Sequence, residues 1–387
     1  MEVAWDDAPL VAQWPGLPPL GGDRTADACV VGLGGSGLAA VTALAARGLS
    51  VIGLDAGRVA AGAAGRNGGF LIAGPEASLH EAIGAWGVEA AIWLYRETLR
   101  ELAALEAALG PQVVRRTGSI RLAGLPGDPE SDAEAADRAA EVSDCAVQAD
   151  AMRRHGLAVE NYEGPLGSGL FLPDDAATNP ALRAVATTRL LAGRATLHEH
   201  TPVHRVERGR VVTALGTVSA AVIVVAVDGR LEVLLPQLIG RVRSARLQML
   251  ATEPIATGRL PCPVYGRWGY DYAQQIPDGR ILAGGGRDRF EADEWTTRAT
   301  PTAPVQVHIE AVARRMAAQR IRVTHRWAAS VGFTPDGRPL CIPVAEDVVA
   351  CGGYNGTGNL VGPVAARAAV SWLLDATAPP AAFDSSP

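Results

Sequence analysis

Three glycines near the start of the chain have the spacing of a dinucleotide-binding turn. Gly32, Gly34 and Gly37 follow an apolar run and precede an alanine-rich one. The first glycine of such a turn permits a tight bend, the second lets backbone approach a pyrophosphate, and the third lets the helix pack on the strand. Free N–H groups at the helix start then bind the phosphate charge. Asp55 ends the next apolar run, where an acid reaches a free ribose 2′-hydroxyl, which favours FAD or NAD over NADP.

A second glycine-rich segment, residues 62–69, follows Asp55 closely and carries Arg66 and Asn67 among small residues. Such a loop suits contact with a diphosphate and an extended flavin, whereas a simple NAD dehydrogenase has no need of one here. The segment therefore favours FAD. The alternatives are NAD alone, or a surface loop without a ligand.

Residues 265–274 form an aromatic stretch in which every second side chain lies on one face of a strand. Tyrosine hydroxyls and an amide on that face would orient an amine or carboxylate, and the rings would exclude water. The alternative is an ordinary sheet face packed on a helix. Arg267, on the other face, is expected to be solvated. The face comprises Trp268, Tyr270, Tyr272 and Gln274.

The composition excludes several classes of function. All 35 basic residues are arginine, so the chain has no lysine for a Schiff base or a P-loop. The five cysteines have no close spacing, which argues against a disulfide framework, a redox dithiol or a metal site. A net charge of −6 without a basic face argues against nucleic acid as a partner. With no apolar run near the length of about 18 residues that spans a membrane, and no signal-like N-terminus, we expect no membrane span and a cytoplasmic protein.

The elements that must position these residues follow from periodicity and turn signals. Residues 1–23 are expected to be an irregular lead-in, and the turn 277–279 to join two antiparallel strands. The expected helices cover residues 38–47, 90–109, 130–142, 180–192, 304–320 and 360–375. The expected strands cover residues 28–31, 50–55, 195–206, 210–213, 220–227, 243–252, 263–276, 280–285 and 348–350.

This order predicts an α/β fold with a discontinuous Rossmann-type domain and an inserted antiparallel-sheet domain that binds the substrate. The nucleotide-binding domain is expected to comprise residues 24–80, 172–240 and 325–378, and the substrate domain residues 81–171 and 241–324.

Five blocks together resemble the FAD-dependent D-amino acid oxidase family, near the branch with glycine oxidase, sarcosine oxidase and gamma-glutamylputrescine oxidase. The resemblance covers essentially the whole chain. It implies FAD, a flavin-binding fold like that of p-hydroxybenzoate hydroxylase, and oxidation of a C–N bond. The blocks are residues 20–32, 54–58, 62–69, 334–337 and 353–358.

The resemblance also implies which residues act. The start of the last helix would present N–H groups and its positive dipole end to the N1/O2 edge of the flavin, stabilising the negative charge of the reduced form. Expected catalytic residues are Tyr270, Tyr272, Gln274, Trp327 and Asn355. Expected FAD contacts are Gly32, Gly34, Gly37, Asp55, Ala56, Ala63, Gly65, Arg66, Asn67, Gly68, Gly69, Val203, Gly356, Thr357, Gly358, Asn359 and Leu360.

Two departures from the family matter. Ala329 stands where sarcosine oxidase-like members attach the flavin through cysteine, so FAD is expected to be non-covalent. Leu360 stands where they bind the substrate carboxylate with lysine, and the lysine that promotes reaction with oxygen is also missing. The missing carboxylate ligand mildly favours a larger or neutral amine as substrate.

The expected reaction transfers a hydride from the carbon next to a neutral amine to flavin N5, and water hydrolyses the resulting imine. Oxygen is the expected acceptor, with another electron acceptor as the alternative. An FAD-binding dehydrogenase, a non-catalytic flavoprotein subunit of a larger complex and an NAD-only dehydrogenase remain alternatives. A disulfide reductase is excluded because no two cysteines are close in sequence.

Overall fold

The first strand, helix and second strand form the expected βαβ unit in the computed structural model, which describes residues 2–384. β1 (Arg24–Val31) and β2 (Val51–Leu54) pair in parallel, and α2 (Gly35–Ala46) crosses between them. The last four residues of β1 and all of β2 are buried, because this sheet is covered on both faces.

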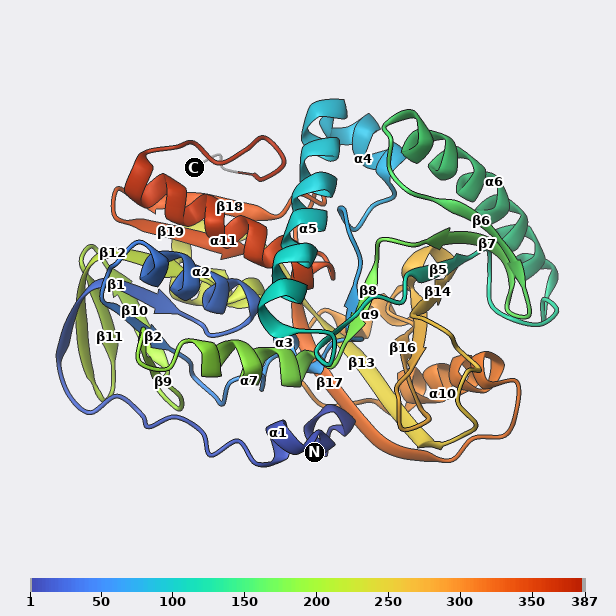
Figure 1. The fold of residues 1–387 in the computed structure, drawn as a ribbon, viewed down its shortest axis with the longest axis horizontal. Coiled ribbons are helices and arrows are strands. Elements are labelled where there is room, and N and C mark those ends of the chain that lie inside the picture. The colour runs from blue at the N-terminus through green and yellow to red at the C-terminus, as the bar shows by residue number, and fades with distance from the viewer. Residues whose placement is uncertain (1, 385–387) are drawn as a thin grey trace.

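The βαβ unit belongs to a sheet of eight strands, which lies on the left in Figure 1. Six of its strands have the order β10-β11-β12-β1-β2-β9. In addition, β19 pairs in parallel with the second half of β12, and β18 pairs with β19. α11 (Gly358–Asp375) packs beside α2 on one face of this sheet. The further strands are β9 (Thr196–His198), β10 (Val203–Glu207), β11 (Arg210–Thr213), β12 (Gly216–Val225), β18 (Leu340–Ala345) and β19 (Val348–Gly352).

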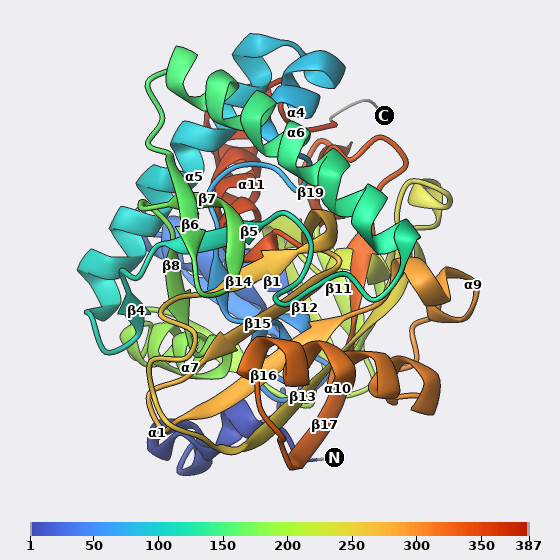
Figure 2. The same cartoon turned by 90° about the vertical axis from the view of Figure 1, so that its right-hand side faces the viewer.

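A second sheet of eight strands lies on the right in Figure 1, in the order β17-β13-β16-β15-β14-β5-β7-β6. All its pairs are antiparallel except β14 with β5. α10 (Ala303–Ala317) packs across β16 and β13, as Figure 2 shows. The strands are β5 (Ser119–Leu122), β6 (Glu160–Gly164), β7 (Gly167–Leu172), β13 (Arg243–Pro254), β14 (Val264–Gly266), β15 (Asp271–Gln275), β16 (Arg280–Gly285) and β17 (Val323–Phe333).

Helices with recognisable start signals connect the two sheets. α4 opens with a capping box between Ser78 and Glu81, and α7 opens with Asn179 as its cap and proline as its first residue. α5 stands between the two halves in Figure 1.

None of the helices described in the structure is both long and apolar enough to span a membrane. The remaining elements are α3 (Ala63–Arg66), α4 (Leu79–Trp86), α5 (Val88–Leu109), α6 (Asp132–Arg154), α7 (Pro180–Leu190) and a small sheet of β3 (Phe70–Leu71), β8 (Ala176–Thr178) and β4 (Val114–Arg115); the short turns are η1 (Ala4–Asp7), α1 (Pro9–Ala12), η2 (Asp228–Arg230), α8 (Leu231–Leu234), η3 (Pro236–Leu238), η4 (Arg267–Gly269), η5 (Asp288–Phe290) and α9 (Glu291–Glu294).

One apolar core joins the two sheets. Leu44 of α2 and Val361 of α11 belong to the same buried cluster as Met249 and Trp327 of the second sheet. Each large apolar side chain buried there contributes roughly 1.5–3 kcal/mol to folding. The core therefore holds the nucleotide-binding turn and the second sheet together.

The expected continuous strand over residues 263–276 is wrong. β14 and β15 form an antiparallel hairpin, and η4 between them holds Arg267 at φ +50° and Trp268 at φ +52°, in the left-handed region. Arg267 is buried, not solvated as expected, because its guanidinium pairs with Asp271 (2.6 Å) and Asp288. Side-chain alternation is therefore interrupted ahead of Tyr270.

The N-terminal lead-in is also more ordered than expected. Residues 4–12 form η1 and α1, and Trp5 is buried with its Nε1 donating to the carbonyl of Asn67 at 2.8 Å. Several element bounds differ too. The helix expected over residues 130–142 continues to Arg154, and β17 pairs along β13 in the second sheet although residues from 325 on were expected in the nucleotide-binding part.

Candidate functional site: a glycine turn and an aromatic cavity

The glycine turn between β1 and α2 has the close packing that its spacing predicts. Gly32 has φ +92°, and a Cβ there would lie 2.5 Å from the carbonyl oxygen of Ala226. A Cβ on Gly37 would lie 1.7 Å from the carbonyl oxygen of Gly32. Gly34 differs, because a Cβ there would meet only Ala64 Cβ, at an ordinary 3.4 Å. Packing inside the protein therefore does not require a glycine at Gly34, which leaves its backbone open to a ligand.

The start of α2 offers an anion site beside this open backbone. Gly34 is the N-cap residue, and no side chain caps the helix. The first N–H groups and the helix dipole therefore favour a negatively charged group at this point. A diphosphate has the charge and the size to accept these donors.

Asp55 closes the other side of the turn. Its Oδ2 accepts the N–H of Leu33 and its Oδ1 accepts the N–H of Gly57, both at 2.8 Å. Burial raises the pKa of Asp55, and these two hydrogen bonds lower it. An ionised carboxylate has about four acceptor sites, so lone pairs remain for a ribose hydroxyl.

The segment that leads into Val203 runs alongside this acid. The N–H of His200 donates to the carbonyl of Gly57 at 2.9 Å, and the N–H of Thr201 donates to the carbonyl of Asp55 at 2.8 Å. Val203, one of the FAD contacts that the family resemblance implies, begins β10 two residues after Thr201. Ala56 is exposed in the same bend.

The second glycine segment is packed as tightly as the first. A Cβ on Gly65 would lie 2.2 Å from the carbonyl oxygen of Ala60, and Gly69 has φ +74° with a virtual Cβ 2.3 Å from the carbonyl oxygen of Thr178. Arg66 does not point freely outward, since it forms two hydrogen bonds of 2.9 Å with Asp6. No sequence motif marks this partner, because it lies in the lead-in.

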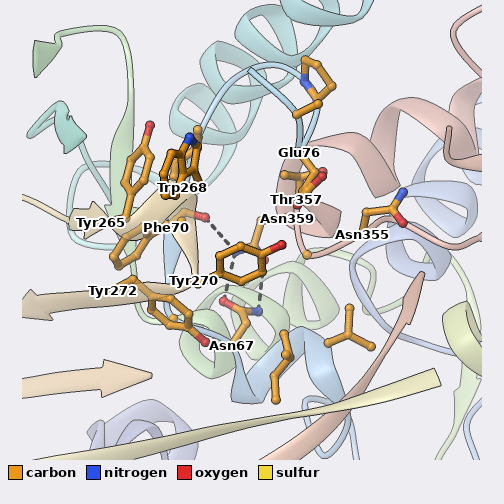
Figure 3. Close-up of a pocket in the computed structure, with 18 of the residues that line it drawn as sticks. Asn67, Phe70, Glu76, Tyr265, Trp268, Tyr270, Tyr272, Asn355, Thr357 and Asn359 are labelled. Atoms are coloured by element: carbon orange, nitrogen blue, oxygen red, sulfur yellow. Dashed lines mark hydrogen bonds between the residues drawn. The ribbon is translucent and has the colours of Figure 1, made fainter. Parts of the chain in front are cut away.

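The beginning of α11 is tied to the second glycine segment. Asn359 Nδ2 donates to Asn67 Oδ1 at 3.0 Å and to the carbonyl of Phe70 at 2.8 Å. Asn67 Oδ1 also accepts the N–H of Gly69 at 2.8 Å. Figure 3 shows the Asn67–Asn359 contact, and both residues line a cavity. No side chain caps α11, whose N-cap is Thr357, so its first N–H groups also face outward from the helix end.

Asn355 and Leu360 serve this helix start in different ways. Asn355, at φ +53°, accepts the N–H of Thr334 at 2.8 Å and donates to the carbonyl of Gly337 at 2.9 Å. It thereby joins the two loops that precede α11. The side chain of Leu360 is fully buried in an apolar cluster with Leu71, and its N–H donates to the carbonyl of Thr357 at 3.3 Å, so its role is to anchor the helix start.

The cavity, of about 530 Å³, opens between the second glycine segment, the start of α11 and the β14–β15 hairpin. Its aromatic wall is held partly by an edge-to-face contact of Phe70 with Tyr272, whose ring centroids are 5.8 Å apart. Trp268 is 41 % exposed on the strained turn η4. Figure 3 shows these side chains around the opening. The aromatic residues that line the cavity include Phe70, Tyr95, Tyr265, Trp268, Tyr270, Tyr272 and Phe333.

The expected catalytic residues divide into two groups. Tyr270, Tyr272 and Asn355 line the cavity. Gln274 and Trp327 do not line it: Gln274 Nε2 donates to the carbonyl of Gly68, and Trp327 Nε1 donates to the carbonyl of Arg66 at 2.8 Å. Both side chains therefore hold the second glycine segment from the protein side. Gln274 lies two residues after Tyr272 on β15, but its amide group is held outside the cavity by the carbonyl of Gly68 and by Arg115, whose Nη2 donates to its Oε1 at 3.1 Å.

Sequence reasoning missed three charged or titratable groups at or near the cavity. Glu76 and Arg287 line it, each from a loop without a motif. Asp175 is buried nearby and accepts hydrogen bonds from Ser119 Oγ at 2.6 Å and from the N–H of Ala73 at 2.9 Å. Burial raises the pKa of Asp175 to about 7.

Comparisons with known proteins agree with this geometry. The family described as FAD dependent oxidoreductase matches residues 27–372. The chain is 28% identical over 390 residues to a probable oxidoreductase, OrdL, of Rhizobium meliloti, covering 92% of this chain and 85% of that protein. It is 28% identical over 293 residues to gamma-glutamylputrescine oxidoreductase of Escherichia coli, covering 68% of this chain and 65% of the relative. The crystal structure of glycine oxidase from Geobacillus kaustophilus has the same fold, with a TM-score of 0.70 and 18% identity over 92% of this chain and 95% of that one.

Proposed function

Because the chain belongs to the family of FAD dependent oxidoreductases, we propose that it oxidises the C–N bond of an amine or amino acid with non-covalently bound FAD. The family confirms the predicted fold class, the cofactor and the assignment as an enzyme. The observation that carries the finer proposal is the cavity of about 530 Å³, which adjoins the second glycine segment and the start of α11 and is walled by tyrosines.

The residues present fit FAD. The open backbone at Gly34, the uncapped start of α2 and the free lone pairs of Asp55 suit the diphosphate and ribose. Ala329 lines the cavity and has no atom that could form a covalent bond to a flavin, which supports non-covalent binding. When bound, FAD supplies a two-electron acceptor for the hydride that leaves the carbon next to nitrogen, and water then hydrolyses the imine.

The tyrosine wall orients the amine without removing its protons. Burial raises the pKa of Tyr272 well above its ordinary value, so its hydroxyl stays protonated at neutral pH. Such a hydroxyl donates and accepts hydrogen bonds but is not a base. The rings of Tyr272 and Phe70 exclude water from the same side of the cavity.

The start of α11 favours negative charge at the edge of the cavity. Asn355 fixes the loop ahead of it with side-chain hydrogen bonds to Thr334, Gly337 and Gly353. The uncapped N–H groups then stabilise charge that develops on a group bound there, and no structural reorganisation is needed. This is the role that the family resemblance gives to residues 355–360.

Oxygen is the acceptor that we propose for reoxidation. The absence of lysine removes one known way of promoting that step, so an acceptor other than oxygen is the second candidate. A dehydrogenase and an oxidase share the same reductive half-reaction, and they differ only in the compound that takes the electrons from the reduced cofactor.

The test is a visible spectrum of the purified protein, recorded anaerobically while amines and amino acids are added one by one. We expect a flavin band that one class of compound bleaches, and recovery of the band in air identifies an oxidase. Recovery only with an artificial acceptor identifies a dehydrogenase. A flavin band that no amine or amino acid bleaches would contradict the proposal and favour a non-catalytic flavoprotein subunit.

A further inference from the structure

Arg287 is a cation at the cavity that has no carboxylate partner among residues 2–384. It lies two residues after the end of β16, and no side-chain hydrogen bond or ion pair joins it to another described residue. The nearest acid along the chain, Asp288, pairs instead with Arg267. Arg121, which also lines the cavity, is neutralised by Asp144.

Aromatic rings hold Arg287 in place. Its guanidinium carbon lies 4.3 Å from the ring centroid of Phe333, 5.6 Å from that of Tyr270 and 5.8 Å from that of Trp295. A guanidinium stacked on rings keeps its N–H edges free, and these edges match a carboxylate in a two-point contact. A half-buried cation without a counter-ion is costly, so this position favours an anionic ligand group.

Glu76 supplies the opposite charge in the same cavity. It lies between β3 and α4, and Figure 3 draws it among the lining side chains. No hydrogen bond or ion pair joins its carboxyl group to another residue of the described chain. Glu81, the other acid of this wall, is already bonded to Ser78 in the capping box. Glu76 is exposed to solvent on one side; partial desolvation raises the pKa of its carboxyl group, and the charge of Arg287 lowers it although the two groups form no ion pair.

Two opposite charges that share a cavity but do not pair are complementary to a molecule that carries both signs. We propose that Arg287 binds the carboxylate and Glu76 the ammonium group of the substrate, which is therefore an amino acid or another amine with a carboxylate, and the ammonium loses a proton before the hydride is transferred. The inference rests on the proposed function and narrows it. It replaces the mild preference for a neutral amine that the missing lysine suggested, because Arg287 supplies the cation from a different element.

The first experiment uses matched ligands and variants. Anaerobic titrations compare phenylalanine, as each enantiomer, with phenethylamine, and proline with pyrrolidine, on wild type, Arg287→Gln, Arg287→Lys and Glu76→Gln. Arg289→Gln is the control, because Arg289 is exposed and outside this cavity. Arg287→Gln should raise the apparent Kd for the amino acid about ten- to hundredfold and leave that for its decarboxylated partner unchanged. Arg287→Lys should restore part of the difference, and Glu76→Gln should weaken both ligands.

Equal effects of Arg287→Gln on the amino acid and on its decarboxylated partner would overturn the proposal, as would no effect on either. A second readout separates it from the proposed function. Propionate and propionamide are titrated into the oxidised holoprotein, and the flavin spectrum reports binding without turnover. Propionate should bind wild type and not Arg287→Gln, even if no amine bleaches the flavin. Equal binding of propionate and propionamide to wild type would refute the anion site while leaving C–N oxidation untouched.

Discussion

The side chain of Asn359 donates a hydrogen bond of 3.0 Å to the side-chain oxygen of Asn67, 292 residues earlier in the chain. The bond joins the first turn of α11 to the second glycine segment. Both are expected to contact FAD, so the contact fixes two halves of the cofactor site relative to each other.

Replacing Asn359 by leucine should therefore weaken FAD binding. The variant loses the bonds to Asn67 and to the carbonyl of Phe70, and this carbonyl is left without its side-chain donor, at a cost of about 1–3 kcal/mol. We expect at least a tenfold higher Kd for FAD, measured by flavin fluorescence during titration of the apoprotein. Asn161→Ala, at an exposed position, serves as the control. An unchanged Kd would show that the link does not shape the site.

Gly34 offers a sharper test of the cofactor position. Gly34→Val should abolish FAD retention while the apoprotein keeps its thermal midpoint, since a Cβ at this residue meets only Ala64 at an ordinary distance. Gly84→Val is the matched control, because Gly84 is exposed on α4, outside the expected cofactor site, and a Cβ there has no neighbour within 4 Å. The measurement is the ratio of flavin to protein absorbance after purification. Normal flavin content in Gly34→Val would contradict the assignment of the turn.

The raised pKa of Asp175 predicts that the stability of the protein depends on pH. Its pKa is about 7 in the folded protein against an ordinary 3.8, so between these values the folded state holds a proton that the unfolded chain has released. The contribution of Asp175 to the free energy of unfolding is therefore fully present below about pH 4, and it is lost as the pH rises to about 7. Asp175→Asn cannot ionise and should gain a few kcal/mol relative to wild type across that window.

Urea denaturation at a series of pH values measures this difference, with Asp137→Asn, an exposed acid that does not act on Asp175, as the control. A difference between wild type and Asp175→Asn that stays constant from pH 4 to pH 7 would be inconsistent with a raised pKa.

A variant of Trp327 tests whether this residue supports the second glycine segment or contacts the substrate. Trp327→Phe keeps a buried ring but loses the donor to the carbonyl of Arg66, which should lower the free energy of unfolding by about 1–3 kcal/mol. Substrate selectivity should not change, because Trp327 does not line the cavity. Changed selectivity at unchanged stability would instead place Trp327 against the substrate.

The glycine positions were predictable from the sequence, because a tight turn imposes its residue type locally. Gly32 and Gly37 show in the structure the close approaches that their spacing implies. The break at η4 was not predictable, because it depends on Arg267 reaching Asp271 and Asp288 after the second sheet has formed. Period-two alternation alone would have continued the strand.

The charged residues of the cavity could not be predicted from the sequence, for a related reason. Glu76 and Arg287 come from loops 211 positions apart in numbering, and neither loop has a motif. Only the packing of the second sheet against the glycine segments brings them to one cavity. Gln274 and Trp327 were expected to be catalytic, but their side chains hold the second glycine segment, because their direction depends on tertiary contacts that a strand pattern does not contain.

Bound FAD should be reduced by cleavage of a C–H bond next to nitrogen in a substrate held in the aromatic cavity. The most direct measurement is a single anaerobic turnover with the bleaching compound, together with quantification of the products. For an acyclic substrate we predict one carbonyl compound and one ammonia or amine released for each FAD reduced, and for a cyclic amine one ring-opened product that carries both groups. Flavin reduction by an acyclic substrate without release of ammonia or an amine would contradict this reaction.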